Sequence, residues 1–88
     1  MQSSRLASLI TFHRKRAKLT QSGLARHAGV SRFVVQDIEA GRDRTTWRNL
    51  LAVLEVLNVK LEPAGPLVEE WRAAQPEAAA KLNEETTT

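Results

Sequence analysis

The chain has 88 residues, a formal net charge of +3 and no cysteine. This length makes one small domain with a modest core, and the lack of cysteine excludes a disulfide framework and a cysteine-ligated zinc finger. Residues 1–50 carry ten Lys and Arg against three acids, whereas residues 51–88 carry three against seven. This segregation predicts a polyanionic partner for the first half, because a merely solvated surface would not require it.

The first residues place apolar side chains before basic ones, which is the reverse of a signal peptide. No apolar run approaches the ~18 residues that a membrane span needs. We therefore expect a cytoplasmic, nucleoid-associated protein without a membrane partner.

The first predicted helix covers residues 4–18, and its apolar face holds Leu6, Leu9, Ile10, His13 and Ala17. A basic cluster occupies its last turns. That cluster complements the helix dipole or contacts phosphate, and we expect Lys15 to contact phosphate. We interpret His13 as a packed side chain, because no second metal ligand follows one helical turn later.

Residues 20–41 predict two short helices around a tight corner. Thr20 caps the first helix, which Gly29 ends, and Ser31 caps the second helix, which Gly41 ends. This is the helix-turn-helix pattern, whose second helix enters the DNA major groove. An ordinary antiparallel helix pair is the alternative, but it needs neither a glycine at the corner nor an exposed polar run after it.

The second of these helices turns Val35 and Ile38 inward and leaves a polar face outward. On that face Arg32 can donate two hydrogen bonds to guanine, and Gln36 can pair with adenine. Phe33 either contacts a thymine methyl group or packs as a satellite core residue, and we favour the groove. Asp37 either accepts from a cytosine amino group or pairs with a neighbouring arginine.

A loop at residues 42–46 ends in the N-cap Thr46, and we expect its Arg42 and Arg44 to contact phosphates. The next predicted helix, residues 47–57, is the most apolar of the chain. Its core face comprises Trp47, Leu50, Leu51, Leu54 and Leu57. A stripe this wide is either the centre of the core or partly an interface.

Residues 59–62 alternate apolar and polar side chains, which predicts a short strand after Asn58 ends the helix. One such strand is not stable alone, so we expect it to pair antiparallel with a second copy. The predicted dimer interface is Val59, Lys60, Leu61 and Glu62. A two-fold axis at Leu61 sets Lys60 opposite Glu62 of the partner subunit, which is favourable.

The quoted residues resemble the Cro/cI-type (XRE) helix-turn-helix family. The match includes Gln21, Ala25, the corner at residues 29–31, Val35 and residues 38–41. The resemblance implies an all-α, five-helix-type lambda-repressor-like domain, with a phosphate contact at Gln21 and an Arg14–Glu39 pair. It also implies that four positions face bases: Ser31, Arg32, Phe33 and Gln36. The chain departs from the family at Phe33, usually small or polar, so the operator sequence does not carry over.

The Thr45-Thr46 cap, the apolar helix and the alternating strand are similar to those of HipB-like antitoxins, over about residues 5–62. This resemblance implies a dimer with strands paired across the two-fold, a palindromic operator, repression of its own operon and a HipA-type Ser/Thr kinase toxin as partner. A free-standing repressor without a toxin is the alternative.

We therefore predict a DNA-binding and dimerisation domain at residues 1–62, then a linker and a C-terminal helical tail at residues 63–88. Three apolar residues of the tail share a face and are possible toxin contacts, or contacts to the partner subunit: Leu67, Val68 and Trp71.

Two other classes of protein fit the sequence poorly. The only candidates for acid–base or nucleophilic chemistry lie on different helices without catalytic spacing: His13, His27, Ser31 and Asp37. We expect no enzymatic activity, no cofactor and no metal. A membrane-surface peptide is disfavoured because the core needs the apolar face of the amphipathic first helix.

Overall fold

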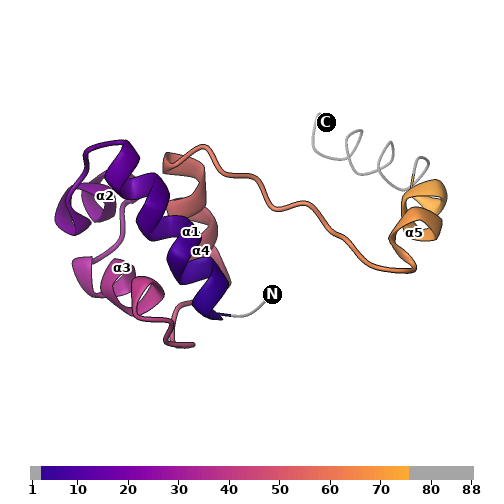
Figure 1. Cartoon of the computed structure of the whole chain (residues 1–88), viewed down its shortest axis with the longest axis horizontal. Coiled ribbons are helices and arrows are strands. Elements are labelled where there is room, and N and C mark those ends of the chain that lie inside the picture. Colours follow the sequence, from indigo (N-terminus) through magenta and orange to yellow (C-terminus); the bar gives the residue numbers. More distant parts are fainter. Residues whose placement is uncertain (1–2, 76–88) are drawn as a thin grey trace, which may run out of the picture.

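The computed structural model describes residues 3–75, which fold into five α-helices and contain no β-strand. Four helices pack together, and the fifth lies apart at the end of an extended segment (Figure 1). Their bounds are Ser3–Arg16 (α1), Gln21–Ala28 (α2), Arg32–Glu39 (α3), Trp47–Val56 (α4) and Val68–Ala74 (α5). The predicted all-α, five-helix architecture is confirmed. No helix of residues 3–75 is long and apolar enough to cross a membrane.

Side-chain caps begin three of the helices where the sequence predicts them. The hydroxyl of Thr20 accepts the backbone N–H of Gly23 at 2.9 Å, and that of Thr46 accepts the N–H of Asn49 at 3.2 Å. Ser31 caps α3 in the same way, over 3.4 Å. Each cap satisfies a backbone donor that has no partner inside the helix, so the start of each helix is fixed locally.

Left-handed residues follow three of the helices as predicted. Gly29 follows α2 with a φ of 71°, Gly41 follows α3 with a φ of 75°, and Asn58 follows α4 with a φ of 57°. The prediction for α1 was too long, because that helix ends at Arg16 and Lys18 takes a φ of 59°. Ala17 therefore lies outside the helix and is exposed, rather than on its apolar face.

The core contains fully buried residues from each of the first four helices: Ile10, Leu24, Val35, Val53 and Leu54. Ala7 of α1 is also buried, although the sequence did not single it out. Leu6, Leu9 and Leu50 pack around this cluster while half-buried. The core thus joins α1 and α4 to the α2–α3 pair and holds the pair as one unit.

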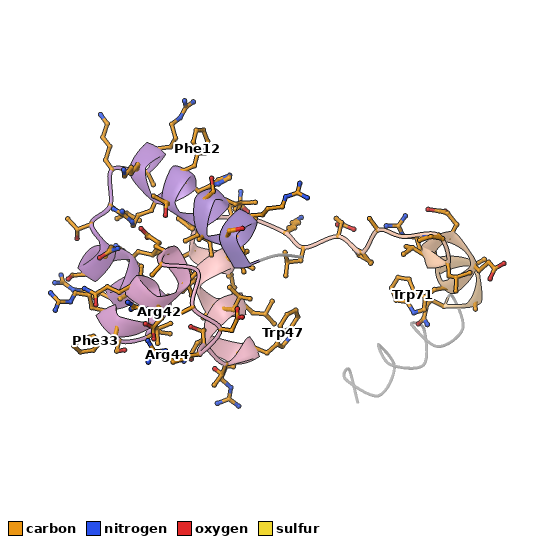
Figure 2. All side chains as sticks on the ribbon, turned by 60° about the horizontal axis from the view of Figure 1, so that its bottom comes forward. Phe12, Phe33, Arg42, Arg44, Trp47 and Trp71 are labelled. Carbon is orange, nitrogen blue, oxygen red and sulfur yellow. The ribbon has the colours of Figure 1, made fainter. Side chains whose placement is uncertain are left out.

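The predicted core face of α4 was partly wrong. Trp47 is 66% exposed and Leu51 is 41% exposed, whereas Val53 and Leu54 are buried. Periodicity places all of these side chains on a broad apolar stripe, but only one side of the stripe has a covering element in the single chain. Figure 2 shows Trp47 pointing outward from its helix. The wide stripe is therefore core on one side and open apolar surface on the other.

Residues 59–62 are extended and carry no assigned strand in the single chain. Val59 and Leu61 pack against the core, and Lys60 and Glu62 are exposed, so the predicted alternation is confirmed. A strand is defined by its hydrogen-bonded neighbour, and the expected neighbour is a second copy. Pairing across a dimer therefore stays a prediction.

The tail begins with α5 as predicted, although this helix carries no buried residue. Arg72 connects the helix to the preceding segment by donating to the Pro63 carbonyl at 3.2 Å, and it also pairs with Glu69 at 2.9 Å. Leu67 is 69% exposed and Trp71 is 49% exposed. The rest of the predicted tail, residues 76–88, lies outside the described residues.

A charged pair connects α1 to α3, as the family resemblance implied. Arg14 donates from Nε to Glu39 Oε2 at 2.7 Å and from Nη2 to Oε1 at 3.0 Å. Its Nη1 donates to the Leu19 carbonyl at 2.9 Å, so the turn after α1 is held as well. The side chains of Arg14 and Glu39 are only 13% and 8% exposed. A bidentate pair of this kind fixes orientation as well as distance.

Burial alone would raise the pKa of the Glu39 carboxyl. Hydrogen bonds from Arg14, Gln21 and Thr11, together with the Arg14 charge, outweigh burial and bring this pKa below its ordinary value of 4.5. The hydrogen bond to Glu39 also raises the pKa of Arg14, against the effect of burial. The stabilisation by the carboxylate is therefore complete well above pH 4.5 and is lost as the pH falls through the lowered pKa.

We predict that Glu39→Gln lowers the free energy of unfolding by about 3 kcal/mol, because it leaves the Arg14 guanidinium without its carboxylate in a mostly buried site. Arg14→Met should have a similar effect, and the double variant should lose less than the two losses together. Urea unfolding at pH 7 measures the free energy of unfolding of the wild type, the two single variants and the double variant. Additive losses would show that the two side chains do not interact.

Candidate nucleic-acid interface

The N-terminal half of α3 presents an exposed face that the core holds in place. Val35 and Ile38 are buried on one side of this helix, which leaves Arg32 and Phe33 exposed. Phe33 is 66% exposed, and the Arg32 guanidinium lies over its ring at 5.5 Å from the centroid. Phe33 is therefore not a satellite core residue. The pair offers one cation and one apolar surface side by side.

The other two predicted base contacts belong to the same helix, with Ser31 as its N-cap and Gln36 in its second turn. Ser31 is exposed, and because its oxygen accepts from Val34, its own hydrogen is available for another acceptor. Gln36, half-buried, follows Arg32 by one helical turn. The structure thus places all four predicted residues within the first turns of α3 and its N-cap.

Gln21, a predicted phosphate contact, donates from Nε2 to Glu39 Oε1 at 3.2 Å and is half-buried. It is therefore part of the Arg14–Glu39 network at the start of α2. An amide nitrogen carries two hydrogens, so this bond leaves one hydrogen for a phosphate oxygen. A structural contact and a phosphate contact are compatible at this residue.

The sequence left two roles open for Asp37, a contact to a cytosine amino group and an ion pair with a neighbouring arginine. The structure shows the ion pair. Asp37 Oδ1 lies 3.2 Å from Arg42 Nη1 and 3.6 Å from Arg44 Nη2. The carboxylate is 26% exposed, and the two arginine side chains are 56% and 68% exposed. Asp37 therefore holds both predicted phosphate contacts of the loop beside α3.

Other exposed groups lie elsewhere on the four-helix body. Figure 2 shows Arg42 and Arg44 on one side of it and Phe12 on the opposite side. Phe12 is 58% exposed, with the Arg16 guanidinium 5.7 Å from its ring centroid. This stack was not predicted from the sequence, although the i, i+4 spacing of Phe12 and Arg16 on α1 was a usable signal. Lys15 is exposed on the same helix.

The two histidines have different environments. His13 is half-buried, and its Nδ1 lies 2.7 Å from the Leu9 carbonyl, consistent with the expected packed side chain. His27 is exposed on α2. In the part of the chain that the structure describes, no three His, Cys, Asp or Glu residues are grouped to hold a metal ion.

Residues 5–67 match the family model described as "Helix-turn-helix domain". This range covers most of the chain, with α2, α3, α4 and all but the first two residues of α1. The chain therefore belongs to the helix-turn-helix domain family. No curated protein matches the sequence significantly.

Among solved structures, the fold is similar to HipB chains. One comes from a HipA–HipB complex with O2 and O3, with a TM-score of 0.67 and 23% identity, over 74% of this chain and 92% of that one. A HipB chain with an O4 20-mer matches to the same extent. A HipB variant with an O2 20-mer has 22% identity at the same TM-score, over 74% of this chain and 90% of that one. At 22–23% identity these matches establish that the chain shares its fold with HipB, and no more than that.

We predict that Asp37→Asn tightens binding to nonspecific duplex DNA and steepens its salt dependence by about one unit, because Arg42 and Arg44 become available to additional phosphates. Glu70→Gln on α5 is the matched control, since it removes one negative charge away from the loop. Fluorescence anisotropy across a salt series measures both variants. Equal slopes for Asp37→Asn and the control would show that Asp37 does not restrain the arginines.

Proposed function

We propose that the protein is a sequence-specific DNA-binding repressor that binds a palindromic operator as a dimer and acts as the antitoxin of a type II toxin–antitoxin module. The observation that carries the DNA-binding part is the start of α3. There Arg32 and Phe33 are exposed and Gln36 is half-buried beside them, while Val35 and Ile38 fix the opposite side of the helix in the core. A helix held in this way can enter the major groove without reorganisation.

The chemistry of this face fits base recognition. Arg32 supplies a planar fork for guanine, and Gln36 supplies a donor and an acceptor for adenine. The Phe33 ring supplies an apolar surface for a thymine methyl group. Because Arg32 stacks on that ring, its guanidinium is partly oriented before DNA binds, which reduces the conformational freedom lost on binding.

Phosphate contacts would come from residues on three separate elements around α3. They are Lys15 on α1, Gln21 on α2, and Arg42 and Arg44 in the loop after α3. Such contacts set the position of a recognition helix without reading sequence. The excess of basic residues in the first half of the chain supports this assignment.

The dimer would form through residues 59–62. Val59 and Leu61 already face the core, so the backbone and the exposed Lys60 and Glu62 remain for a partner strand. With the axis at Leu61, each Lys60 meets Glu62 of the partner subunit. Two recognition helices related by this axis should fit successive major grooves ~34 Å apart, or a multiple of that distance.

The antitoxin role rests on the fold shared with HipB and on the tail. Leu67 and Trp71 expose apolar surface on a segment that DNA binding does not require. Together with the half-buried Val68, they would contact a HipA-type Ser/Thr kinase toxin, and the pair would repress its own operon. A free-standing repressor of the same fold is the second candidate. On either proposal the protein has no catalytic role.

Base contacts and phosphate contacts are distinguishable by their effects on binding. We predict that Arg32→Ala and Gln36→Ala each weaken operator binding by ~1–3 kcal/mol and relax preference at one base position. Lys15→Ala should weaken binding to all sequences evenly and lower the salt slope by about one unit. Titrations of operator and scrambled duplexes measure both. An equal loss of affinity for both duplexes in Arg32→Ala would show that Arg32 contacts the DNA phosphate backbone rather than a base.

Removal of the tail separates DNA binding from toxin binding. We predict that truncation after Pro63 leaves dimerisation and operator binding nearly intact and abolishes co-purification of a co-expressed HipA-type kinase, the proposed toxin. Leu67→Glu in the full chain should have the same effect, because it places a charge on the exposed apolar face. Loss of dimerisation on truncation would instead assign the tail to the subunit interface. A toxin that still co-purifies would refute the tail contact.

A further inference from the structure

The outward side of α4 is an apolar surface between two opposite charges. Trp47 is 66% exposed and Leu51 is 41% exposed, one helical turn apart. Arg48 and Glu55 are exposed on the same side of the helix, and neither has an ion-pair partner among residues 3–75. We call these four residues the α4 face.

We propose that the α4 face binds the α4 face of a second copy, with the two helices antiparallel about the two-fold axis. The inference rests on the proposed dimer and adds a second contact to the one predicted at residues 59–62. It also changes the role of Trp47, which becomes an interface residue rather than a core residue.

The charges on α4 favour the antiparallel pairing of the two helices. In an antiparallel pair about a two-fold axis, the numbers of facing residues have a constant sum. An axis at the middle of Trp47–Val56 sets Leu51 opposite Ala52 and sets Arg48 opposite Glu55 of the partner subunit. Both ends of the contact then hold opposite charges. A parallel pair would bring like charges to the same level, which is unfavourable.

The α4 face is continuous with the predicted strand contact. An open apolar groove beside it is lined by Leu6, Trp47, Leu50, Leu61, Glu62 and Pro63. Trp47 and Leu61 therefore border the same groove, and one partner can cover both surfaces. A four-residue strand pair alone is far smaller than the ~800 Å² per partner that a specific interface buries. The α4 face supplies additional apolar area where the strand needs it.

Charge reversal tests the pairing. Arg48→Glu and Glu55→Arg each turn two attractive contacts per dimer into repulsive ones, so each should raise the dimer dissociation constant roughly tenfold or more. A chain with both substitutions should regain the wild-type value. An equimolar mixture of the two single variants should form heterodimers in preference to either homodimer. Sedimentation equilibrium and native mass spectrometry measure these outcomes.

Phe12→Glu on α1 is the matched control, because Phe12 is also exposed and should leave the dissociation constant unchanged. A wild-type dimer that is insensitive to both single reversals would refute this inference alone. Leu61→Lys tests the strand contact, since it places like charges at the predicted axis and should give a folded monomer. A wild-type chain that is monomeric at every concentration would refute the proposed dimer itself.

Trp47 reports the contact directly. In Trp71→Phe it is the only tryptophan, and its emission should shift to longer wavelength as the dimer dissociates on dilution. Emission that stays constant through dissociation would show that the partner does not cover the α4 face. A shift to longer wavelength on truncation after Pro63, with the dimer retained, would identify the chain's own tail as the occupant and refute the proposal.

Discussion

The bidentate pair of Arg14 and Glu39 is the interaction on which the orientation of α3 depends. The core side chains Val35 and Ile38 hold α3 against its neighbours, but apolar packing is not directional. The pair adds two hydrogen bonds of defined geometry between α1 and α3, at 2.7 and 3.0 Å. Because the carboxylate also accepts from Gln21, the start of α2 is fixed in the same network. The rotation of α3 about its axis, and hence its outward face, follows from this network.

Ion pairs with Asp37 limit how much positive charge the loop after α3 can offer to a polyanion. Asp37 lies within ion-pair distance of both Arg42 and Arg44, so its carboxylate partly neutralises the two loop arginines. In the proposed DNA complex, fewer available cations would weaken the sequence-independent attraction to phosphates and leave base contacts with a larger share of the binding energy. On the proposed function, Asp37 would therefore favour discrimination between sequences over affinity for any duplex.

Much of the fold could be predicted because it depends on local chemistry. The caps at Thr20, Ser31 and Thr46 and the left-handed Gly29 need only a few neighbouring residues. The Arg14–Glu39 pair joins residues 25 positions apart, and only the family resemblance indicated it. Helical periodicity placed Trp47 on an apolar stripe, but periodicity cannot tell what covers that stripe. The partner of Asp37 stayed open because it depends on the path of the following loop.

Apart from Phe12 on α1, the exposed apolar surfaces of the described residues are assigned to three proposed partners. Phe33 on α3 belongs to the DNA face, Trp47 on α4 to the second copy, and Trp71 on α5 to the toxin. They lie on different helices, and α5 is separate from the four-helix body (Figure 1). The three contacts can therefore form at the same time, as a regulator that binds toxin and operator together requires.

Selection of binding sites from a random duplex library by the full chain is the most direct test of sequence-specific binding by a dimer through α3. We expect one enriched motif with two-fold symmetry, whose half-sites are centred ~10 base pairs apart or a multiple of that distance. Enrichment should be lost when the selection is repeated with Arg32→Ala and Gln36→Ala combined. A library that shows no enriched sequence, or a single half-site without symmetry, would contradict the account.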